Sequence, residues 1–352
     1  MGSDLRVGVL GYGTGGRVFH APLVAATPGL RLAAIVSGNP ERAARAAADH
    51  PGAEVLPDAD ALFAGAGELD LIVVSTPNRT HVPLALRAVE AGLPVVVDKP
   101  FAPSAAEARR VAAAASAAGV ALTVFQNRRF DGDFLTVRRL VDEGLLGTVC
   151  RFESRFDRWR PRPKDTWRER GDPADAGGLL YDLGAHLVDQ AMVLFGPVAE
   201  VYAELDARRP GVAADDDTFV ALRHAGGVRS HLWASALAAT RNPRFRVLGD
   251  RAAYTKYGLD PQERQIADGL RPGDPGWGVE PGSAAGTLGV DDDVRRVPTE
   301  PGAYQRFYAE LRDALRGGGP LPVDPAGPVA ALRVLEAARA SAVEHRVVRL
   351  TG

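Results

Sequence analysis

Residues 9–22 read VLGYGTGGRVFHAP, and this stretch decides how the N-terminal part of the chain folds. It continues an apolar run that starts at residue 5 and leads into a helical segment. The GxGxxG spacing is supplied by Gly11, Gly13 and Gly16. In such a turn the first glycine permits the tight bend, the second lets the backbone approach a pyrophosphate, and the third lets helix pack on strand. A glycine-rich turn without a ligand can have the same letters, so the spacing needs support from its surroundings.

The pattern around this turn predicts a parallel sheet. Short β-branched runs alternate with alanine-rich helical stretches as far as residue 125, which is typical of βαβ units. Strands are expected at 5–10, 30–36, 53–56, 69–75, 93–98 and 121–126, with helices at 81–92 and 104–119 among those between them. We therefore expect a Rossmann NAD(P)-binding domain over residues 1–124.

Beyond residue 125 the sequence changes to strands in series. They are expected at 148–157, 200–207, 218–224, 228–235, 245–249 and 251–257, with a helix from GGLLYDLGAHLVDQ (177–190) among them, a surface excursion at 271–302 and helices at 303–316 and 325–344. This order predicts a large, mostly antiparallel open sheet. The fold class is therefore α/β, and residues 125–352 form a C-terminal α/β substrate and oligomerisation domain.

Composition and charge exclude several classes of protein. With 352 residues, 46% of them hydrophobic and 24% charged, the chain can build two domains with real cores. A net charge of −2, with both signs interspersed, argues against nucleic acid as a partner. The single cysteine, Cys150, excludes an internal disulfide and a cysteine-cluster metal site. No stretch approaches the roughly 20 apolar residues of a membrane span and no secretory signal begins the chain, so we expect a cytoplasmic protein without a membrane partner.

The end of the second strand indicates which dinucleotide is preferred. An NAD site usually offers an acid to the ribose there, whereas VSGNPERA (36–43) offers Ser37 and, a few residues on, Arg42. A hydroxyl and a guanidinium suit a 2′-phosphate, so NADP is favoured and NAD is the less expected cofactor. The alternative is that Arg42 is only a solvated helix residue.

The fifth strand ends in VVVDKPFAP (95–103), which contains a candidate catalytic lysine. Ligands of open α/β sheets bind beyond the carboxyl ends of the strands, where Lys99 emerges. Pro100 excludes helix at Lys99. Alone, this segment would more often be a solvated turn. Together with the glycine-rich turn, it makes Lys99 a catalytic candidate.

The predicted helix at 177–190 carries Asp182 and His186 four positions apart. This spacing puts the acid and the imidazole on one helix face. Alone, the two could be a satisfied buried pair. With Asp189 they could also ligate a metal, but chemistry on a dinucleotide needs none and no cysteine cluster supports one, so we predict no metal.

Five motifs, in this order, resemble those of the Gfo/Idh/MocA oxidoreductases, which include glucose-fructose oxidoreductase and inositol dehydrogenases. The motifs extend over essentially the whole chain and are GYGTGGRVFHAP (11–22), STPNRTH (75–81), DKPF (98–101), TVFQNRRFDGDF (123–134) and GGLLYDLGAHLVDQ. DKPF, NRRFDGDF and FDRWRP (156–161) look most similar to the NADP-dependent scyllo-inositol dehydrogenase-like branch. The usual family motif is Glu-Lys-Pro, so Asp98 is a departure that shortens the acid before Lys99.

The resemblance implies an NADP-dependent oxidoreductase that transfers a hydride between the nicotinamide and a secondary hydroxyl or carbonyl of a cyclitol, sugar or related polyol. It implies catalytic roles for Lys99, Asp182 and His186, with Lys99 and His186 in proton transfer. The expected cofactor contacts are Gly11, Tyr12, Gly13, Gly15, Gly16, Ser37, Arg42, Thr76, Pro77, Asn78, His81, Lys99, Pro100, Trp167 and Arg168. The expected substrate contacts are Asn127, Arg128, Trp159, Asp182 and His186.

Several alternatives stay open beside this interpretation. The family also contains catalytically silent NADP-binding sensors or regulators, but a silent protein has no reason to retain all three catalytic candidates. Asn78 could instead cap the helix that follows it, and the segment NRR (127–129) could be a charged loop. The open sheet needs its outer face covered, and the resemblance implies the same, so we expect a homodimer or homotetramer.

Overall fold

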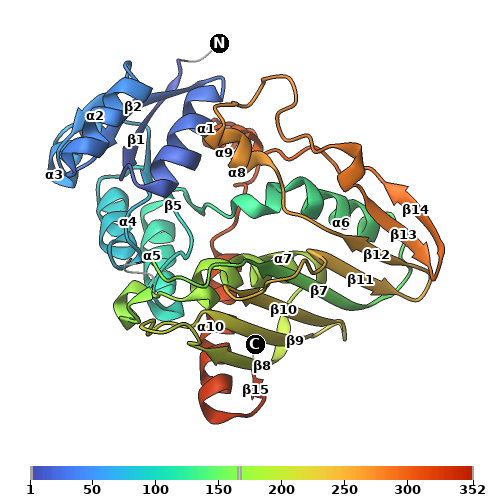
Figure 1. Ribbon diagram of the computed structural model, residues 1–352. Helices are drawn as coiled ribbons and strands as arrows, with labels where there is room; N and C mark the ends of the chain where they lie inside the picture. The colour runs from blue at the N-terminus through green and yellow to red at the C-terminus, as the bar shows by residue number, and fades with distance from the viewer. Residues whose placement is uncertain (1–2, 165, 167–168, 351–352) are drawn as a thin grey trace. The chain divides into compact units, whose positions relative to one another are not determined.

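The computed structural model describes residues 3–350 apart from 165, 167 and 168. The chain forms two compact units (Figure 1). The first consists of Met1–Phe130, Pro261–Gly278 and Ala303–Val329, and the second of Asp131–Asp260, Val279–Gly302 and Ala330–Gly352. The late segments Pro261–Gly278 and Ala303–Val329 thus belong to the first unit. The domain limits 1–124 and 125–352 stay a prediction.

The first unit contains a six-stranded sheet in the order β3-β2-β1-β4-β5-β6, and all of its neighbouring pairs are parallel. The strands are β1 (Leu5–Leu10), β2 (Leu30–Val36), β3 (Glu54–Leu56), β4 (Leu71–Val74), β5 (Val95–Val97) and β6 (Leu122–Val124). This order confirms the Rossmann prediction. It reverses between β1 and β4, and ligands of such sheets bind beyond the carboxyl ends of the strands at this point.

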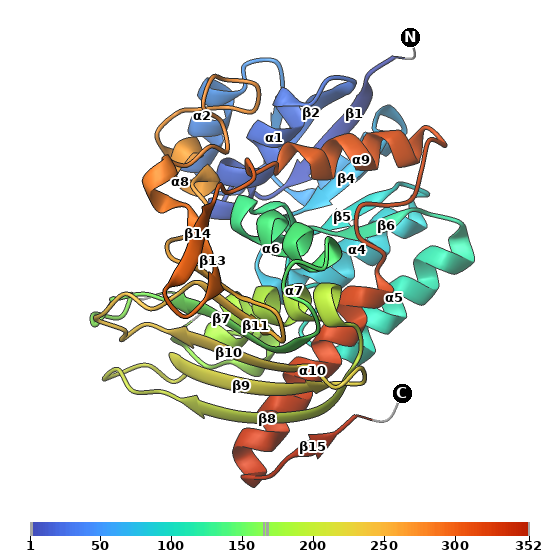
Figure 2. The same cartoon turned by 90° about the vertical axis from the view of Figure 1, so that its right-hand side faces the viewer.

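Helices surround this sheet, and the last of them comes from late in the chain. They are η1 (Gly15–His20), α1 (Ala21–Ala26), α2 (Pro40–Asp49), α3 (Ala59–Ala64), α4 (His81–Glu90), α5 (Ala105–Ala118), α8 (Gln262–Ala267) and α9 (Gln305–Leu315), with short 3-10 turns at Ala66–Glu68, Asn78–Thr80 and Asn127–Phe130. In Figures 1 and 2, α4 lies beside α5 and α1 beside α9. Phe307 and Tyr308 of α9 are fully buried beside Phe125, in the same apolar cluster as Val7 and Val9. Helix α9 therefore completes the core of the first unit.

Local sequence explains where α5 begins and ends. The hydroxyl of Ser104 accepts a hydrogen bond from the backbone N–H of Glu107 at 3.2 Å and donates to its carboxylate at 3.0 Å. Ser104 is therefore the N-cap of this helix, and Glu107 stands at the third position after it, as in the S-x-x-E spacing of a capping box. Gly119 ends the helix in a left-handed conformation with a φ of +65°. The predicted helix at 104–119 is thus confirmed by both of its ends.

The second unit contains a nine-stranded sheet in the order β14-β13-β12-β11-β7-β10-β9-β8-β15 (Figure 2). Its strands are β7 (Val149–Asp157), β8 (Val198–Asp206), β9 (Asp217–His224), β10 (Arg229–Ser235), β11 (Phe245–Gly249), β12 (Ala253–Lys256), β13 (Gly286–Val290), β14 (Asp293–Val297) and β15 (Val348–Arg349). Its helices are α6 (Gly132–Asp142), η7 (Leu180–Gly184), α7 (Ala185–Phe195) and most of α10 (Ala326–Glu344). All its ladders are antiparallel except β10 with β7, so the prediction of a mostly antiparallel sheet is confirmed.

The prediction of a plain surface excursion at 271–302 is wrong. Strands β13 and β14 form a hairpin there and extend the edge of the sheet. A Cβ on Gly289 would collide with the carbonyl oxygen of Asp293, and the turn contains Asp291 with a φ of +49°. Gly289 and Asp291 therefore allow the close strand pairing and the tight turn of a hairpin at this edge of the sheet.

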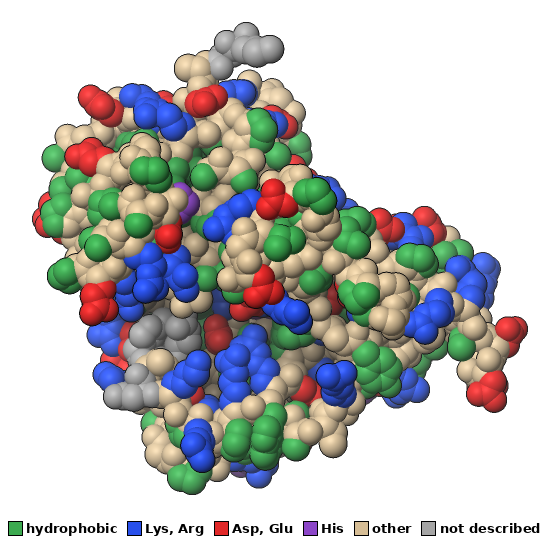
Figure 3. Space-filling view, turned by 45° about the horizontal axis from the view of Figure 1, so that its top comes forward, with side chains coloured by type: hydrophobic (Ala, Val, Ile, Leu, Met, Phe, Trp, Pro, Cys, Tyr) green, Lys and Arg blue, Asp and Glu red, His purple; other side chains and the backbone are tan. Residues whose placement is uncertain are grey.

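Charged side chains of both signs lie on the face drawn in Figure 3, with several Lys and Arg side chains gathered across its middle. Acidic and basic side chains both occur there among neutral and apolar ones, in line with the net charge of −2. Among the described residues, no helix has the length and hydropathy that crossing a bilayer requires.

Candidate functional site

Three glycines of the turn after β1, Gly11, Gly15 and Gly16, are packed too closely for another residue type. Gly11 has a φ of +101°, and an added Cβ would collide with the carbonyl oxygen of Ser75. A Cβ on Gly16 would collide with the carbonyl oxygen of Gly11. One on Gly15 would lie 2.6 Å from Asp98 Oδ2 and also meet Ser75 Oγ. The turn is thus held against the ends of β4 and β5.

Gly13 differs because it faces open space on one side. The neighbour of an added Cβ would be Arg42 Nη1, at 3.9 Å. Arg42 is exposed on α2, whose first turn is capped by Asn39, which accepts from the Arg42 backbone N–H at 2.9 Å. Ser37 follows β2, and its hydroxyl donates to the carbonyl oxygen of Asn39 at 3.4 Å. The fold therefore brings the Arg42 guanidinium beside the turn that the sequence assigned to a pyrophosphate.

Tyr12, between these glycines, is buried rather than presented to solvent. Its side chain is 3% exposed, and its hydroxyl donates to Asp49 at 2.8 Å. Burial, with the hydrogen bond to Asp49, raises the pKa of Tyr12 well above its ordinary value. A predicted cofactor contact of Tyr12 would therefore come from its backbone or ring edge and not from an ionised hydroxyl.

The segment after β4 carries four predicted cofactor contacts, Thr76, Pro77, Asn78 and His81. Pro77 is exposed and Thr76 half-buried, whereas Asn78 and His81 are buried. The cap position of α4 is occupied by Thr80, so Asn78 is not the residue that caps this helix.

His81 joins this segment to the Lys-Pro turn. Its Nδ1 lies 2.9 Å from the carbonyl oxygen of Pro100 and its Nε2 lies 2.9 Å from that of Thr76. Burial lowers the pKa of His81, while the charge of Asp98 and the two carbonyl oxygens act in the opposite direction. His81 therefore connects the backbone of the Lys-Pro turn with that of the segment after β4.

Lys99 lies directly after β5, where the sequence predicted it. Its backbone N–H donates to Asp98 Oδ1 at 2.8 Å, and the Lys99–Pro100 bond is cis. Asp98 Oδ2 accepts from the hydroxyl of Ser75 at 3.0 Å. Lys99, Asp98 and the glycine-rich turn are thus brought together within the first unit.

Asn127 and Arg128 follow β6 in the same unit. Both are buried, at 4% and 6% exposure. The guanidinium of Arg128 pairs with Glu263 of α8 at 3.0 Å, so the segment NRR is not simply a solvated charged loop. A substrate role for both residues stays a prediction.

In the second unit, Asp182 lies on η7 and His186 on α7, which follows it without a break. His186 is 3% exposed, and its ring lies 6.4 Å from that of Phe156, centroid to centroid. Asp182 is half-buried. The helix that carries both residues is therefore built as the sequence predicted, with its first turn in the wider π form.

The start of this helix is held by Asp215, which sequence reasoning missed. Asp215 Oδ2 accepts from the backbone N–H of Leu180 at 2.7 Å and from the hydroxyl of Thr218 at 3.0 Å. Gly178 has a φ of +88°, and an added Cβ would collide with the Asp215 carboxylate. Burial raises the pKa of Asp215, although both hydrogen bonds oppose this. The collision with the Asp215 carboxylate explains why a glycine stands at position 178, before the helix.

The remaining predicted residues lie at the surface or outside the described residues. Trp159 is 59% exposed and forms an isolated bridge with Leu237. Trp167 and Arg168 lie outside the described residues. Within the described part of the chain, no three His, Cys, Asp or Glu side chains are grouped so that they could hold a metal ion. Lys99 belongs to the first unit and His186 to the second, so their joint action stays a prediction.

Comparison with known proteins agrees with this arrangement. The chain matches the oxidoreductase family with an NAD-binding Rossmann fold over residues 5–126 and the GFO/IDH/MocA C-terminal domain over residues 134–255. It is 42% identical to the oxidoreductase YdgJ of Escherichia coli (strain K12), with 98% of both chains covered. It is 32% identical to scyllo-inositol 2-dehydrogenase (NADP(+)) IolW of Bacillus subtilis (strain 168), with 98% of this chain and 96% of that one covered.

Solved structures give the same answer. The structure of the YPO2259 oxidoreductase from Yersinia pestis matches with a TM-score of 0.92 at 40% identity, covering 100% of this chain and 99% of that one. The resemblance inferred from five sequence motifs is thus confirmed over the whole length. The chain belongs to the Gfo/Idh/MocA family of oxidoreductases, and its relatives include inositol dehydrogenases.

Proposed function

We propose that this protein is an NADP-dependent oxidoreductase that transfers a hydride between the nicotinamide and a secondary hydroxyl or carbonyl of a cyclitol, sugar or related polyol. The observation that carries the proposal is the position of Arg42 Nη1, 3.9 Å from where a Cβ of Gly13 would be. A guanidinium beside the pyrophosphate turn suits the additional phosphate of NADP. The relative IolW is an NADP-dependent scyllo-inositol dehydrogenase by name, which supports both the cofactor and the substrate class.

The residues around the turn fit a bound dinucleotide. Gly13 leaves backbone open towards Arg42, whereas Gly11, Gly15 and Gly16 hold the turn in place by close packing. When bound, NADP supplies the hydride acceptor or donor. Gly13 and Arg42 would bind its phosphates, and Asn78 and His81 would shape the adjoining segment.

The proton is handled by side chains of this chain. A secondary alcohol loses its hydroxyl proton as its carbinol hydrogen leaves, so one group must remain hydrogen-bonded to the oxygen throughout. We assign this role to Lys99 and His186. Asp182 would orient one of them or bind a neighbouring hydroxyl of the substrate. Asn127, Arg128 and Trp159 would contact other substrate hydroxyls.

One assay tests the function directly. The protein is incubated with a panel of inositols, pentoses, hexoses and keto-sugars, each with NADP and with NAD, and the nicotinamide absorbance is followed. Turnover of at least one polyol supports the proposal. Tight NADPH binding without turnover of any substrate would instead favour the silent sensor or regulator.

The cofactor preference gives a first quantitative prediction. We expect the catalytic efficiency, kcat/KM, to be about tenfold or more higher with NADP than with NAD. Arg42→Ala should narrow this difference, chiefly by weakening the apparent affinity for NADP. A charge-assisted contact to phosphate contributes about 1.5–3 kcal/mol. Steady-state kinetics with both cofactors measure the gap. Arg45→Ala, an exposed arginine on the same helix, is the matched control and should leave it unchanged. Equal efficiency with both cofactors in the unmutated protein contradicts the prediction.

The outer face of the second sheet supports a homo-oligomer. On β9 and β10, buried residues alternate with half-buried ones that include Phe219, His231 and Trp233. The Phe219 and Trp233 rings lie 5.2 Å apart, and the guanidinium of Arg155 lies 3.8 Å from the Trp233 ring centroid. Aromatic and arginine side chains of this kind are enriched at interfaces between proteins.

We therefore expect a dimer or tetramer in sedimentation at micromolar concentration, because burying these aromatic side chains stabilises the assembly. Trp233→Glu should shift the protein towards the 37.2 kDa monomer, since it places a charge in the expected interface. Val343→Glu, which alters an apolar side chain 80% exposed on α10, is the control and should leave the oligomeric state unchanged. A single 37.2 kDa species for the unmutated protein would show the expectation to be wrong.

A further inference from the structure

A buried polar series links three elements of the first unit beneath the Lys99 turn. His20 ends η1 and is fully buried, and its Nδ1 lies 2.6 Å from the hydroxyl of Tyr308 on α9. Its Nε2 faces Asp98 Oδ2 at 3.4 Å. This approach is an ion-pair contact and not a hydrogen bond, and among the described residues Nε2 has no hydrogen-bond partner. The Asp98 carboxylate is therefore the group that the outer nitrogen of His20 addresses.

Asp98 in turn contacts both turns of the proposed cofactor site. Oδ1 accepts from the backbone N–H of Lys99 at 2.8 Å, and Oδ2 accepts from the hydroxyl of Ser75 at 3.0 Å. A Cβ on Gly15 would lie 2.6 Å from Oδ2, so the glycine-rich turn rests against this carboxylate. A rotation of Asp98 would change the Lys99 turn and the glycine-rich turn together.

The chemistry of the series determines where the protons lie. A carboxylate only accepts, so Nε2 of His20 must carry hydrogen, and the Tyr308 hydroxyl completes the contact at Nδ1. Burial alone would raise the pKa of Asp98, but His20, with the charges of His81 and Lys99, lowers it to about 2. Burial and the charge of Asp98 raise the pKa of Tyr308, which stays protonated. Asp98 is thus an anion and Tyr308 a neutral phenol at any ordinary pH.

We propose that His20 and Tyr308 are positioning residues, which hold Asp98 in the one rotamer that sets the Lys99 turn against the glycine-rich turn. The proposal rests on the proposed function in so far as Lys99 handles the substrate proton. It assigns a role to the histidine of the FHAP segment, which no motif explained, and to a tyrosine from the far end of the chain. It also explains why an aspartate precedes Lys99, because this short acid already reaches His20, Ser75 and the Lys99 backbone.

His20→Phe tests the series, because it keeps a ring beside Phe125, whose centroid lies 4.3 Å away, and removes both nitrogens. We expect kcat with scyllo-inositol to fall about 10- to 100-fold with little change in the substrate KM, since misplacement of a catalytic group by about 1 Å can cost 100-fold. NADPH affinity, measured by its fluorescence, should weaken severalfold. Tyr308→Phe should change both quantities in the same direction but less.

The controls match these residues in burial. His224 in the second unit is also fully buried, with its ring nitrogens 2.9 Å from the Gly196 carbonyl oxygen and 2.8 Å from Ser230 Oγ. Tyr254 is buried too, and its hydroxyl has no partner among the described residues. His224→Phe and Tyr254→Phe should leave kcat and NADPH affinity unchanged per folded molecule. An equal loss in His224→Phe would overturn the proposal, because stability alone would then explain the effect.

A spectroscopic measurement needs neither substrate nor cofactor. The 15N chemical shifts of the His20 ring, assigned by comparison with His20→Phe, should show a protonated Nε2. Asp98→Asn should change the shift of this nitrogen by removing its anionic partner. An unprotonated Nε2, or wild-type kcat and NADPH affinity in His20→Phe, overturns the proposal. If the unmutated protein turns over no polyol, the proposed function fails. The NADPH affinities and the 15N shifts of the His20 ring then still decide whether His20 and Tyr308 position Asp98.

Discussion

Replacement of Lys99 by methionine is expected to lower turnover about 100-fold or more, the usual contribution of a general acid or base. Methionine keeps an unbranched side chain of similar length but cannot exchange a proton with the substrate oxygen. The backbone contact of residue 99 with Asp98 Oδ1, at 2.8 Å, is retained. NADPH affinity should change little, because the phosphates are assigned to the glycine-rich turn and Arg42.

The decisive measurement is hydride transfer in a single turnover, alongside an NADPH titration. Arg109→Met removes an exposed cation from α5 of the same unit and should leave both readouts unchanged. His186→Ala should also lower transfer, partly through weaker substrate binding. If Lys99 and His186 serve one proton transfer, the double replacement should cost much less than the sum of the two single losses in free energy.

Near-normal transfer in Lys99→Met would make Lys99 only a turn residue. Full additivity of the two losses would instead separate the roles of Lys99 and His186. The double replacement therefore tests whether Lys99 and His186 serve the same proton transfer.

The sheet of the first unit could be predicted from sequence because each strand is a short β-branched run bounded by a turn or a helix. Strand β2 was expected at 30–36 and is Leu30–Val36 in the structure. The later hairpin of β13 and β14 was missed, because glycines and three consecutive aspartates at 291–293 hide its alternation. Helix α6, Gly132–Asp142, is not among the expected helices, because its first turn overlaps the motif TVFQNRRFDGDF (123–134).

The candidate site divides in a similar way. The positions of the glycines and of Lys99 directly after β1 and β5 could be predicted because they depend on local spacing after a strand. His20 and Asp215 could not, because each acts through a partner that only the folded chain brings near: Asp98 for His20 and Leu180 for Asp215. The signal for Asp215 was present only indirectly, in a glycine at 178 that no capping rule required.

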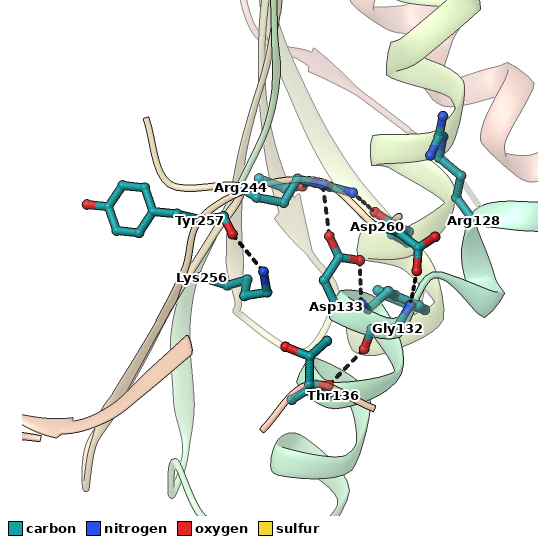
Figure 4. Close-up of polar contacts among 12 residues, drawn as sticks. Arg128, Gly132, Asp133, Thr136, Arg244, Lys256, Tyr257 and Asp260 are labelled. Carbon is teal, nitrogen blue, oxygen red and sulfur yellow. Dashed lines mark hydrogen bonds and ion pairs between the residues drawn. The ribbon is translucent and has the colours of Figure 1, made fainter. Parts of the chain in front are cut away.

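The helix that carries His186 is also held by a buried charge network in the second unit, and Figure 4 shows its Arg244 and Asp133. The Arg244 guanidinium is 4.1 Å from the Phe156 ring centroid and 4.0 Å from that of Phe245. It donates to Ser154 Oγ at 2.5 Å and to Gln190 Oε1 of α7 at 2.9 Å. Its Nε pairs with Asp133 Oδ2 of α6 at 3.6 Å, and both side chains are 1% exposed. Arg244 therefore ties α7 to α6 and to the sheet.

Arg244→Met is expected to lower the free energy of unfolding by about 3–5 kcal/mol, because it leaves the Asp133 carboxylate buried without its cation. Methionine can still fill the space between the two phenylalanine rings, so packing changes little. Urea unfolding followed by circular dichroism measures the loss. Adding Asp133→Asn should recover part of this loss by removing the buried charge. Arg246→Met, which alters a guanidinium 48% exposed on β11, the strand that begins directly after Arg244, should cost about 1 kcal/mol or less. A loss in Arg244→Met no larger than that control would show that the buried pair contributes nothing to stability.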